Sequence, residues 1–283
     1  MSLDKNWFTE ANDNGVAFSL RIKERLHQEK TQYQQIEIFD TTDFGKLMVI
    51  DGCTMVSSRD NFIYHEMMSH PALFSHPNPK QILIIGGGDC GTLKEVLKHS
   101  GVKAALQVEI DERVTRLSEK YFPELCTSNK DARAEFYFGD GIRWVKEAAA
   151  GTYDLIIVDS TDPVGPAKGL FTENFYRDCF SALGEEGILV QQSESPLLHT
   201  DLIKSMRGAM TVVGFSKCHT LCFPQCIYPS GWWSATMAMK SKDSDFDWDK
   251  RAKKMSFKTS YYAADVHRGA LALPPFLQNA LLD

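Results

Sequence analysis

The chain has 283 residues, of which 43% are hydrophobic, and its formal net charge is −6 at pH 7. This length and hydrophobic content suffice for one large or two modest domains, each with a real core. The acidic balance disfavours nucleic acid or an anionic membrane as the main partner, because either calls for a basic face, and the apolar runs are too short to span a bilayer.

The seven cysteines follow no regular framework, which is typical of reduced thiols in a cytosolic chain. Cys218, Cys222 and Cys226 are close in sequence, but the second ligand pair of a zinc site is missing, and Pro224 interrupts any helix that would align them. We therefore expect no metal site. The N-terminal stretch lacks the apolar core of a signal peptide, and we expect a cytoplasmic location.

Residues 1–60 are expected to form a small β domain. Phe18, Leu20 and Ile22 alternate with polar residues, and the run LMVI-DG-CTMV predicts a hairpin with Asp51-Gly52 as its turn. Nothing here has catalytic spacing, so covering the mouth of a cleft or self-association is its expected role.

A helix is predicted next, over residues 61–74 (NFIYHEMMSHPALF). Its polar members are Tyr64, His65 and His70. On the pattern alone, these are packed helix residues whose polar tips are satisfied by neighbours.

The stretch Gln81–Gly91 (QILIIGGGDCG) predicts a buried strand and a tight turn, and TLKEVLKHS after it predicts a helix. The spacing Gly86-x-Gly88-x-x-Gly91 satisfies the dinucleotide fingerprint. Asp89 argues against a dinucleotide, because a carboxylate inside the turn repels a pyrophosphate and attracts a cation.

Strands and helices alternate from residue 80 onward, so residues 61–283 are expected to form an α/β domain with a mostly parallel sheet. Further helices are predicted over 112–122, 142–150, 172–183 and 201–213, and residues 226–238 (CIYPSGWWSATMA) predict an antiparallel hairpin around Pro229-Ser230-Gly231.

Acidic residues recur where these strands end. In an open α/β sheet the ligand lies outside the carboxyl ends of the strands, so we expect these side chains to converge on one acidic crevice with a cationic ligand. They are Asp89, Glu109, Asp111, Asp140, Asp159 and Asp162.

Individual carboxylates differ in what they can do. Glu109 suits bidentate bonds with ribose hydroxyls. Asp140 can accept from an adenine amino group, or cap the helix that begins after it, and both can hold at once. Asp159 and Asp162 form an acid pair that leads into a flexible lid at residues 163–169, which we expect to close on substrate.

One reaction needs such carboxylates without a nucleophilic Ser or Cys, a metal or a phosphate cradle: attack of an amine on a sulfonium carbon. The thioether leaves uncharged, but the amine must lose a proton, so one Asp can serve as base. Asp89 would repel the carboxylate of S-adenosylmethionine and attract the amine of its decarboxylated form, which favours aminopropyl over methyl transfer.

Taken together, several motifs closely resemble the polyamine aminopropyltransferases, the spermidine synthases. They are Phe62–Met68, Gly86–Asp89, Val108–Asp111, Asp140-Gly141, Asp159–Pro163 and Tyr228–Gly231. The resemblance implies a Rossmann-like, methyltransferase-type domain preceded by a small N-terminal β domain, in a homodimer or homotetramer without metal or other cofactor. It implies putrescine as the default acceptor, and decarboxylated S-adenosylmethionine as co-substrate.

The resemblance also implies roles for single residues. Asp159 is the expected base, aided by Tyr64. The expected donor-binding residues are Gln34, Gly86, Gly88, Asp89, Glu109, Asp140, Gly141 and Pro166. The expected amine-binding residues are His65, Asp89, Asp159, Asp162, Gln192 and Tyr228.

Two features depart from the family pattern, and two other functions stay open. Cys90 stands where many members have glycine, and Trp232-Trp233 is bulkier than expected, so it is either a core element or a narrowing of the amine pocket. An S-adenosylmethionine methyltransferase shares the fold, and a non-catalytic polyamine-binding protein is the alternative outside enzymes. Cadaverine, agmatine or spermidine remain possible acceptors.

Overall fold

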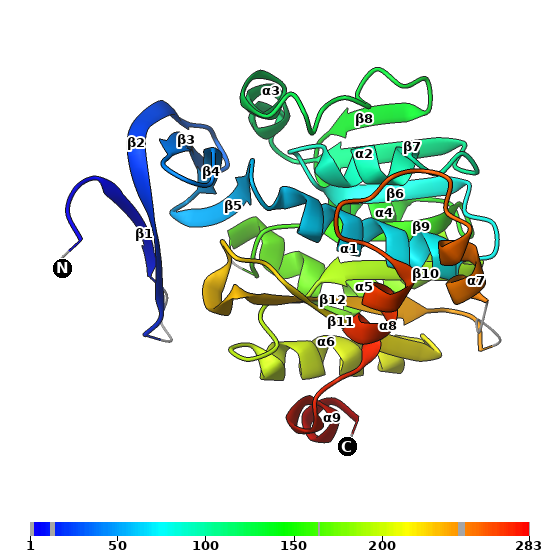
Figure 1. Cartoon of the computed structure of the whole chain (residues 1–283). Helices are drawn as coiled ribbons and strands as arrows, with labels where there is room; N and C mark the ends of the chain where they lie inside the picture. Colours follow the sequence, from blue (N-terminus) through cyan, green and yellow to red (C-terminus); the bar gives the residue numbers. More distant parts are fainter. Residues whose placement is uncertain (1–2, 12–14, 164, 243–246, 283) are drawn as a thin grey trace.

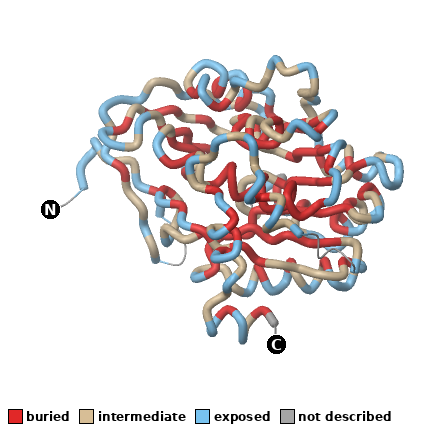
Figure 2. Tube along the Cα trace, turned by 45° about the vertical axis from the view of Figure 1, so that its right-hand side comes forward, coloured by how far each residue is buried: buried red, intermediate tan, exposed pale blue. Residues whose placement is uncertain are grey.

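Two β-sheets stand next to each other, and the first helix leads from the end of the first sheet across one face of the second (Figure 1). The computed structural model describes residues 3–11, 15–163, 165–242 and 247–282, and for Pro166 and Leu282 it describes the backbone alone. Figure 2 shows that the strands in the middle of the molecule are buried, while exposed residues gather on turns and outer helices.

The first sheet is antiparallel, and its five strands are neighbours in chain order. They are β1 (Trp7–Ala11), β2 (Ala17–Lys30), β3 (Gln35–Thr41), β4 (Lys46–Ile50) and β5 (Cys53–Ser57). The predicted hairpin is confirmed, because Asp51 and Gly52 join β4 to β5 with φ of 49° and 87°, the positive values that a tight two-residue turn requires.

The second sheet has seven strands in the order β11-β12-β10-β9-β6-β7-β8. They are β6 (Gln81–Gly86), β7 (Ala104–Glu109), β8 (Ala134–Phe138), β9 (Tyr153–Asp159), β10 (Leu183–Gln192), β11 (Lys217–Pro224) and β12 (Trp232–Met239). The strands from β10 to β8 are parallel, whereas β12 is antiparallel to both of its neighbours. The chain runs outward from β6 to β8 and then returns to β9 on the other side of β6, which places a topological switch point between β6 and β9.

Helices cover both faces of this sheet, so the predicted α/β fold is confirmed. They are α1 (Asn61–Ser75), α2 (Gly91–Leu97), α3 (Glu112–Tyr121), α4 (Gly141–Glu147), α5 (Glu173–Ala182), α6 (Thr200–Val213), α7 (Trp248–Lys253), α8 (Ala264–Leu271) and α9 (Pro275–Leu282), with 3₁₀ turns η1 (Gly165–Phe171) and η2 (Pro229–Gly231). Helices α1, α2 and α8 pack on one face, and α4, α5 and α6 on the other.

Two predicted element ends differ from the structure. Helix α2 ends at Leu97 because the amides of Lys98 and His99 bond three residues back, which tightens the last turn. The C-terminal hairpin forms around Pro229–Gly231 as predicted, but β11 ends at Pro224, and residues 225–228 belong to the turn.

The seam between the two sheets is apolar. Val114 and Leu117 of α3 pack against Ile36 and Ile38 of β3. On the opposite face of the first sheet, Ile227 joins the cluster that contains Phe39, Leu47 and Val49. The first sheet is therefore held in contact with the second unit on both of its faces.

Helix α1 is buried along nearly its whole length, with Glu66 as a buried acid near its start. The Glu66 carboxylate accepts hydrogen bonds from the backbone N–H groups of Ser260, Tyr261 and Tyr262, at 2.7, 2.8 and 2.7 Å. The C-terminal segment is thereby tied to this helix.

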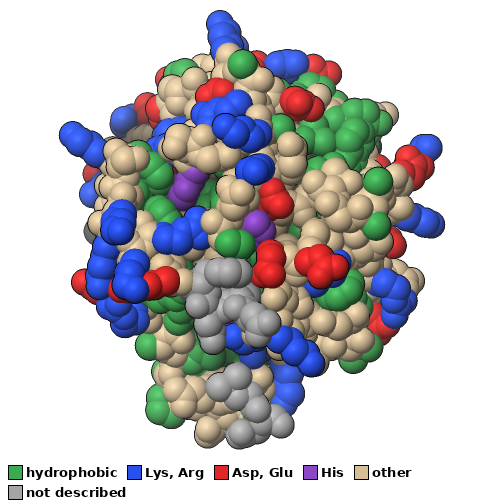
Figure 3. Space-filling model, turned by 90° about the vertical axis from the view of Figure 1, so that its right-hand side faces the viewer, with side chains coloured by type: hydrophobic (Ala, Val, Ile, Leu, Met, Phe, Trp, Pro, Cys, Tyr) green, Lys and Arg blue, Asp and Glu red, His purple; other side chains and the backbone are tan. Residues whose placement is uncertain are grey.

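Charges of both signs are interspersed on the face shown in Figure 3, where Lys and Arg side chains alternate with Asp and Glu. Within the described part of the chain, no helix combines the length and apolar character needed to cross a membrane.

Candidate active site

A cavity of about 550 Å³ opens over the carboxyl ends of the parallel strands, beside the switch point. It collects most of the predicted site residues into one crevice. Those among its lining are Gln34, Tyr64, Gly86, Gly88, Asp89, Glu109, Asp140, Gly141, Asp159, Asp162 and Tyr228.

The turn after β6 has glycine at positions where neighbouring groups leave no space for a side chain. A Cβ at Gly86 would lie 2.2 Å from the carbonyl oxygen of Asp159, and one at Gly88 would lie 2.8 Å from Oε2 of Glu109. Cys90 continues the turn with φ of 70°, a conformation that L-residues seldom adopt, and its side chain is fully buried rather than in the cavity. With cysteine at position 90, the backbone of the turn therefore still faces the cavity without a side chain of Cys90 in the way.

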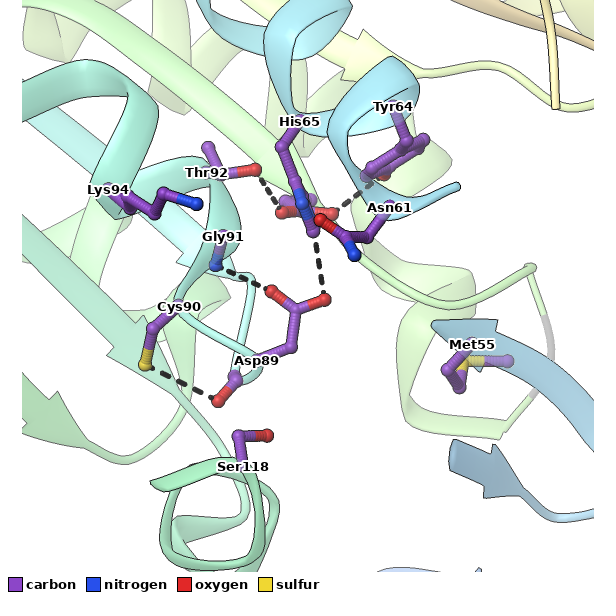
Figure 4. Close-up of polar contacts among 12 residues, drawn as sticks. Met55, Asn61, Tyr64, His65, Asp89, Cys90, Gly91, Thr92, Lys94 and Ser118 are labelled. Atoms are coloured by element: carbon purple, nitrogen blue, oxygen red, sulfur yellow. Dashed lines mark hydrogen bonds and ion pairs between the residues drawn. The ribbon is translucent and has the colours of Figure 1, made fainter. Parts of the chain in front are cut away.

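Asp89 projects from this turn and is held at both oxygens. Its Oδ1 accepts the backbone N–H of Gly91 at 2.8 Å, and its Oδ2 lies 3.0 Å from Nε2 of His65 (Figure 4). Burial alone would lower the pKa of His65, but the carboxylates around it, Asp89 first and then Asp159 and Glu95, together outweigh burial and raise that pKa. The His65 ring packs so closely on Gly91 that a Cβ there would lie 2.2 Å from it.

Asp159, at the end of β9, is also held at both oxygens. The Tyr64 hydroxyl donates to Oδ1 at 2.7 Å, and the Thr92 hydroxyl donates to Oδ2 at 2.6 Å. Burial and the nearby Asp89 raise the pKa of Asp159, while His65, Thr92 and Tyr64 oppose that rise. We call Asp89 and Asp159, with these three partners, the Asp159 cluster.

Glu109 is buried at the end of β7, and its Oε1 accepts the backbone N–H of Asp111 at 2.9 Å. Burial, reinforced by Asp111 and Asp159, raises the pKa of Glu109 to about 7. Near neutral pH the protonated and charged forms of this carboxyl are therefore both populated, and a ligand that donates hydrogen bonds to it would favour the charged form.

Asp111 departs from the expectation that all the strand-end acids face the crevice. It does not line the cavity, because its Oδ1 caps α3 through the N–H of Arg113 and its Oδ2 accepts from Thr31 at 2.7 Å and Gln34 at 3.1 Å. Asp111 thus joins the loop between β2 and β3 to the end of β7, and it fixes the Gln34 amide at the cavity wall.

Asp140 has the capping role that the sequence left open. Its Oδ1 accepts the N–H groups of Ile142 at 2.8 Å and Arg143 at 3.4 Å at the start of α4. Its other carboxylate oxygen stays available at the cavity wall. Gly141 fits there because a Cβ would lie 2.5 Å from the side chain of Ile85.

A second, narrow cavity of about 30 Å³ adjoins the first and shares Tyr64, Asp162 and Tyr228 with it. Glu10 of β1 and Gln192 of β10 also line it. The Tyr228 hydroxyl donates to the carbonyl of Met55 at 2.6 Å, which leaves its ring against Tyr64.

Two acids, Glu10 and Asp162, line this narrow cavity, and Glu194 lies next to Asp162 outside the lining. We call these three residues the Glu194 cluster. Glu10 accepts from the N–H and hydroxyl of Thr54, both at 2.7 Å. Burial, and after it the neighbouring Asp162 carboxylate, raise the pKa of Glu194 to about 10. Near pH 7 the Glu194 carboxyl therefore carries a proton.

Sequence reasoning missed Glu10, Thr92 and Glu194. Glu194 follows the end of β10, so the strand-end rule that found the other acids could have found it. Glu10 lies inside β1, and Thr92 lies inside the predicted helix, where no sequence signal marks either residue.

The two tryptophans have different positions. Trp233 is buried in the main core cluster and also lines the narrow cavity, with its ring 4.6 Å from that of Tyr228. Trp232 packs instead against Phe276 of α9.

The expected lid, residues 163–169, overlaps the 3₁₀ turn η1, and Gly165, Ala167 and Leu170 of η1 line the large cavity. Val164 lies outside the described residues, as does the side chain of Pro166. Among the residues that the structure does describe, no group of three or more His, Cys, Asp and Glu side chains is arranged to hold a metal.

Comparison with known proteins gives the family of this arrangement. The profile described as "Spermine/spermidine synthase domain" matches residues 61–248, and the profile described as "Spermidine synthase tetramerisation domain" matches residues 6–57. The polyamine aminopropyltransferases of Thioalkalivibrio sulfidiphilus and Methylococcus capsulatus are 61% and 63% identical to the chain. The alignments cover 99% of this chain and 99% of the first relative, and 98% of this chain and 97% of the second.

Solved structures agree with the sequence matches. A spermidine synthase in complex with the transition-state analogue AdoDATO superposes with a TM-score of 0.93 at 36% identity, covering 99% of this chain and 96% of that one. The spermidine synthase of Thermotoga maritima gives a TM-score of 0.91 at 36% identity, covering 97% and 94%.

Proposed function

Since the chain belongs to the spermine/spermidine synthase family and is an aminopropyltransferase, we propose that it is a spermidine synthase. It transfers the aminopropyl group of decarboxylated S-adenosylmethionine to putrescine and yields spermidine and 5'-methylthioadenosine. Asp159 is the general base of this reaction.

The position of Asp159 carries the proposal. Its carboxylate lines the large cavity, and its partner Tyr64 borders both the large and the narrow cavity. A base at this junction can reach an amine that enters from the narrow side while the sulfonium donor occupies the large side.

The large cavity suits the donor. Glu109 offers a buried carboxylate to ribose hydroxyls, and Asp140 with Gly141 offers polar groups to adenine. Asp89 presents a carboxylate to the amine of the aminopropyl arm, and His65 fixes its direction. Gln34, Gly86, Gly88 and Pro166 complete the proposed donor site.

The narrow cavity suits an acceptor with a second ammonium group. Asp162, beside Glu10 and Glu194, supplies negative charge away from the reacting end, and Gln192 and Tyr228 supply polar walls. A monoamine would leave this acid group without a counter-charge, which supports putrescine as the acceptor.

The chemistry balances without a further cofactor. The amine nitrogen forms a bond to the carbon beside the sulfonium, and the carbon–sulfur bond breaks to leave a neutral thioether. Deprotonating an amine of pKa near 10.4 costs about 4.6 kcal/mol at pH 7. A base whose pKa is raised by burial takes that proton with less penalty than an ordinary carboxylate, and Tyr64 orients it.

Assembly and location complete the proposal. The match of the first sheet to a tetramerisation profile supports a homodimer or homotetramer built through that sheet. None of the seven cysteines, all of which are described, is in a disulfide, which supports a reducing, cytoplasmic compartment.

The test is product analysis by mass spectrometry, with putrescine, cadaverine, agmatine and spermidine each offered beside decarboxylated or intact S-adenosylmethionine. We expect spermidine and 5'-methylthioadenosine from putrescine and the decarboxylated donor. Methylated amine from the intact donor would overturn the donor assignment, and preferential turnover of another amine would overturn the acceptor assignment.

A further inference from the structure

Thr92 is a buried residue at the start of α2 that the proposed chemistry has not used. It donates its hydroxyl to Oδ2 of Asp159 at 2.6 Å, across 67 positions of sequence. It is absent from the described linings of both cavities, so it touches the carboxylate from behind and not the ligand space.

Two hydroxyls therefore grip one carboxylate. Figure 4 shows Tyr64 on α1 and Thr92 on α2 pointing toward the same acid from two sides of His65, each with its hydrogen bond drawn. Each hydroxyl satisfies a different oxygen, so rotation of the Asp159 side chain would break both bonds at once.

We infer that Thr92 is a positioning residue that keeps Asp159 in one rotamer and in its charged form before the amine arrives. The inference rests on the proposed function only in treating Asp159 as the base. The contact itself is a property of the folded chain.

The surroundings make such a donor necessary. Burial and Asp89 both raise the pKa of Asp159, and a protonated Asp159 could not accept the amine proton. The titratable groups that face it come from several elements: Tyr64 and His65 of α1, Asp89 of the turn, Glu109 of β7, and Tyr228 after β11. Only donors such as His65, Tyr64 and Thr92 favour the charged form.

Thr92 is also the donor that can be removed with least disturbance to the ligand space. Tyr64 lines both cavities and packs on Tyr228, so changing it alters the acceptor pocket. Thr92→Val keeps the shape and removes only the hydroxyl, while Thr92→Ser keeps the hydroxyl. Thr115→Val is a matched control, because Thr115 is buried on α3 and its Oγ1 has no partner among the described residues.

Two readouts test the inference in the full-length protein. The first is a ¹³C NMR titration of the Asp159 carboxyl carbon, assigned by its loss in Asp159→Asn. The second is the pH profile of kcat/KM for putrescine. We expect Thr92→Val to raise the pKa of Asp159 by about one unit and to move the acidic limb of the kcat/KM profile to higher pH by the same amount. At pH values below this limb kcat/KM should fall about tenfold, and on the plateau it should stay nearly unchanged.

Rescue separates positioning from packing. Thr92→Ser should restore both readouts, and Thr115→Val should leave both unchanged. An unchanged carboxyl titration in folded Thr92→Val, or a Ser variant that behaves like Val, would overturn the inference. A raised carboxyl pKa with an unmoved limb would support the contact and instead contradict Asp159 as the base.

Discussion

The Asp159 cluster and the Glu194 cluster are both groups of buried or half-buried acids at the same crevice, but their carboxyl groups have different partners. All four carboxylate oxygens of Asp89 and Asp159 face a hydroxyl, amide or imidazole group. In the Glu194 cluster, burial and then the neighbouring Asp162 raise the pKa of Glu194 to about 10, so this carboxyl is protonated near pH 7. The donors around the first cluster favour the charged form of its carboxylates, whereas Glu194 in the second holds a proton that a cation can displace.

Replacing the proposed base, the central residue of the Asp159 cluster, should have the largest effect on turnover. Asp159→Asn keeps the size of the side chain but cannot take a proton, so we expect kcat to fall by about 10²–10⁴-fold. Steady-state kinetics measure this, and calorimetry with 5'-methylthioadenosine should show donor-site binding retained. Asp265→Asn, on an exposed part of α8, is the control; near-normal turnover in Asp159→Asn would exclude it as base.

Asp89→Asn should come next in size. We expect the donor KM to rise about 10- to 100-fold, because a charged hydrogen-bond partner of the aminopropyl ammonium is lost. The preference for decarboxylated over intact S-adenosylmethionine should narrow in parallel, which competition binding would measure. An unchanged preference would mean that Asp89 does not face the arm that distinguishes the two donors.

A smaller effect, the release of a proton when putrescine binds, should distinguish the Glu194 cluster from the Asp159 cluster. Binding of putrescine to the wild type near pH 8 should release about one proton, because an ammonium beside Asp162 lowers the raised pKa of Glu194. Calorimetry in buffers of different ionisation enthalpy counts these protons. Glu194→Gln should abolish the release and Glu112→Gln, on the exposed face of α3, should not; release that persists in Glu194→Gln would place the stored proton elsewhere.

The last expected effect is on the pH dependence of stability rather than on turnover or binding. The pKa of Glu194 is about 10 in the folded chain and near 4.5 when unfolded, so the native state binds the extra proton between these values. Its contribution to stability is complete below pH 4.5 and is lost as the pH rises toward 10. The free energy of unfolding of Glu194→Gln should therefore exceed that of the wild type by a margin that grows from pH 5 to pH 9, measured by urea titration. A constant margin would contradict the raised pKa.

The sequence predicted those parts of the site that depend on a strand, its end and the turn that follows. Gly86, Glu109 and Asp159 meet because parallel strands end at one edge, and that rule needs no knowledge of packing. Asp111 does not follow this rule, because its role as a helix cap turns its side chain toward Thr31. Strand ends bring residues to an edge, but local hydrogen bonds decide which way they point.

The residues that sequence reasoning missed depend on contacts between distant segments. Glu10 reaches the narrow cavity only because the first sheet docks on the second unit, and it bonds Thr54 across 44 positions. Thr92 reads as an ordinary helix residue until β9 places Asp159 beside it. Neither contact leaves a periodicity or spacing that a single sequence can display.

The three hydrogen bonds that Glu66 accepts from residues 260–262 bear on the order in which the parts of the crevice form. Tyr64 and His65 stand two and one places before Glu66 on the same helix. This helix is therefore anchored from behind by residues that follow every crevice residue in the chain. During synthesis the crevice residues are made before residues 260–262, so the helix that carries Tyr64 and His65 gains this anchor only after them.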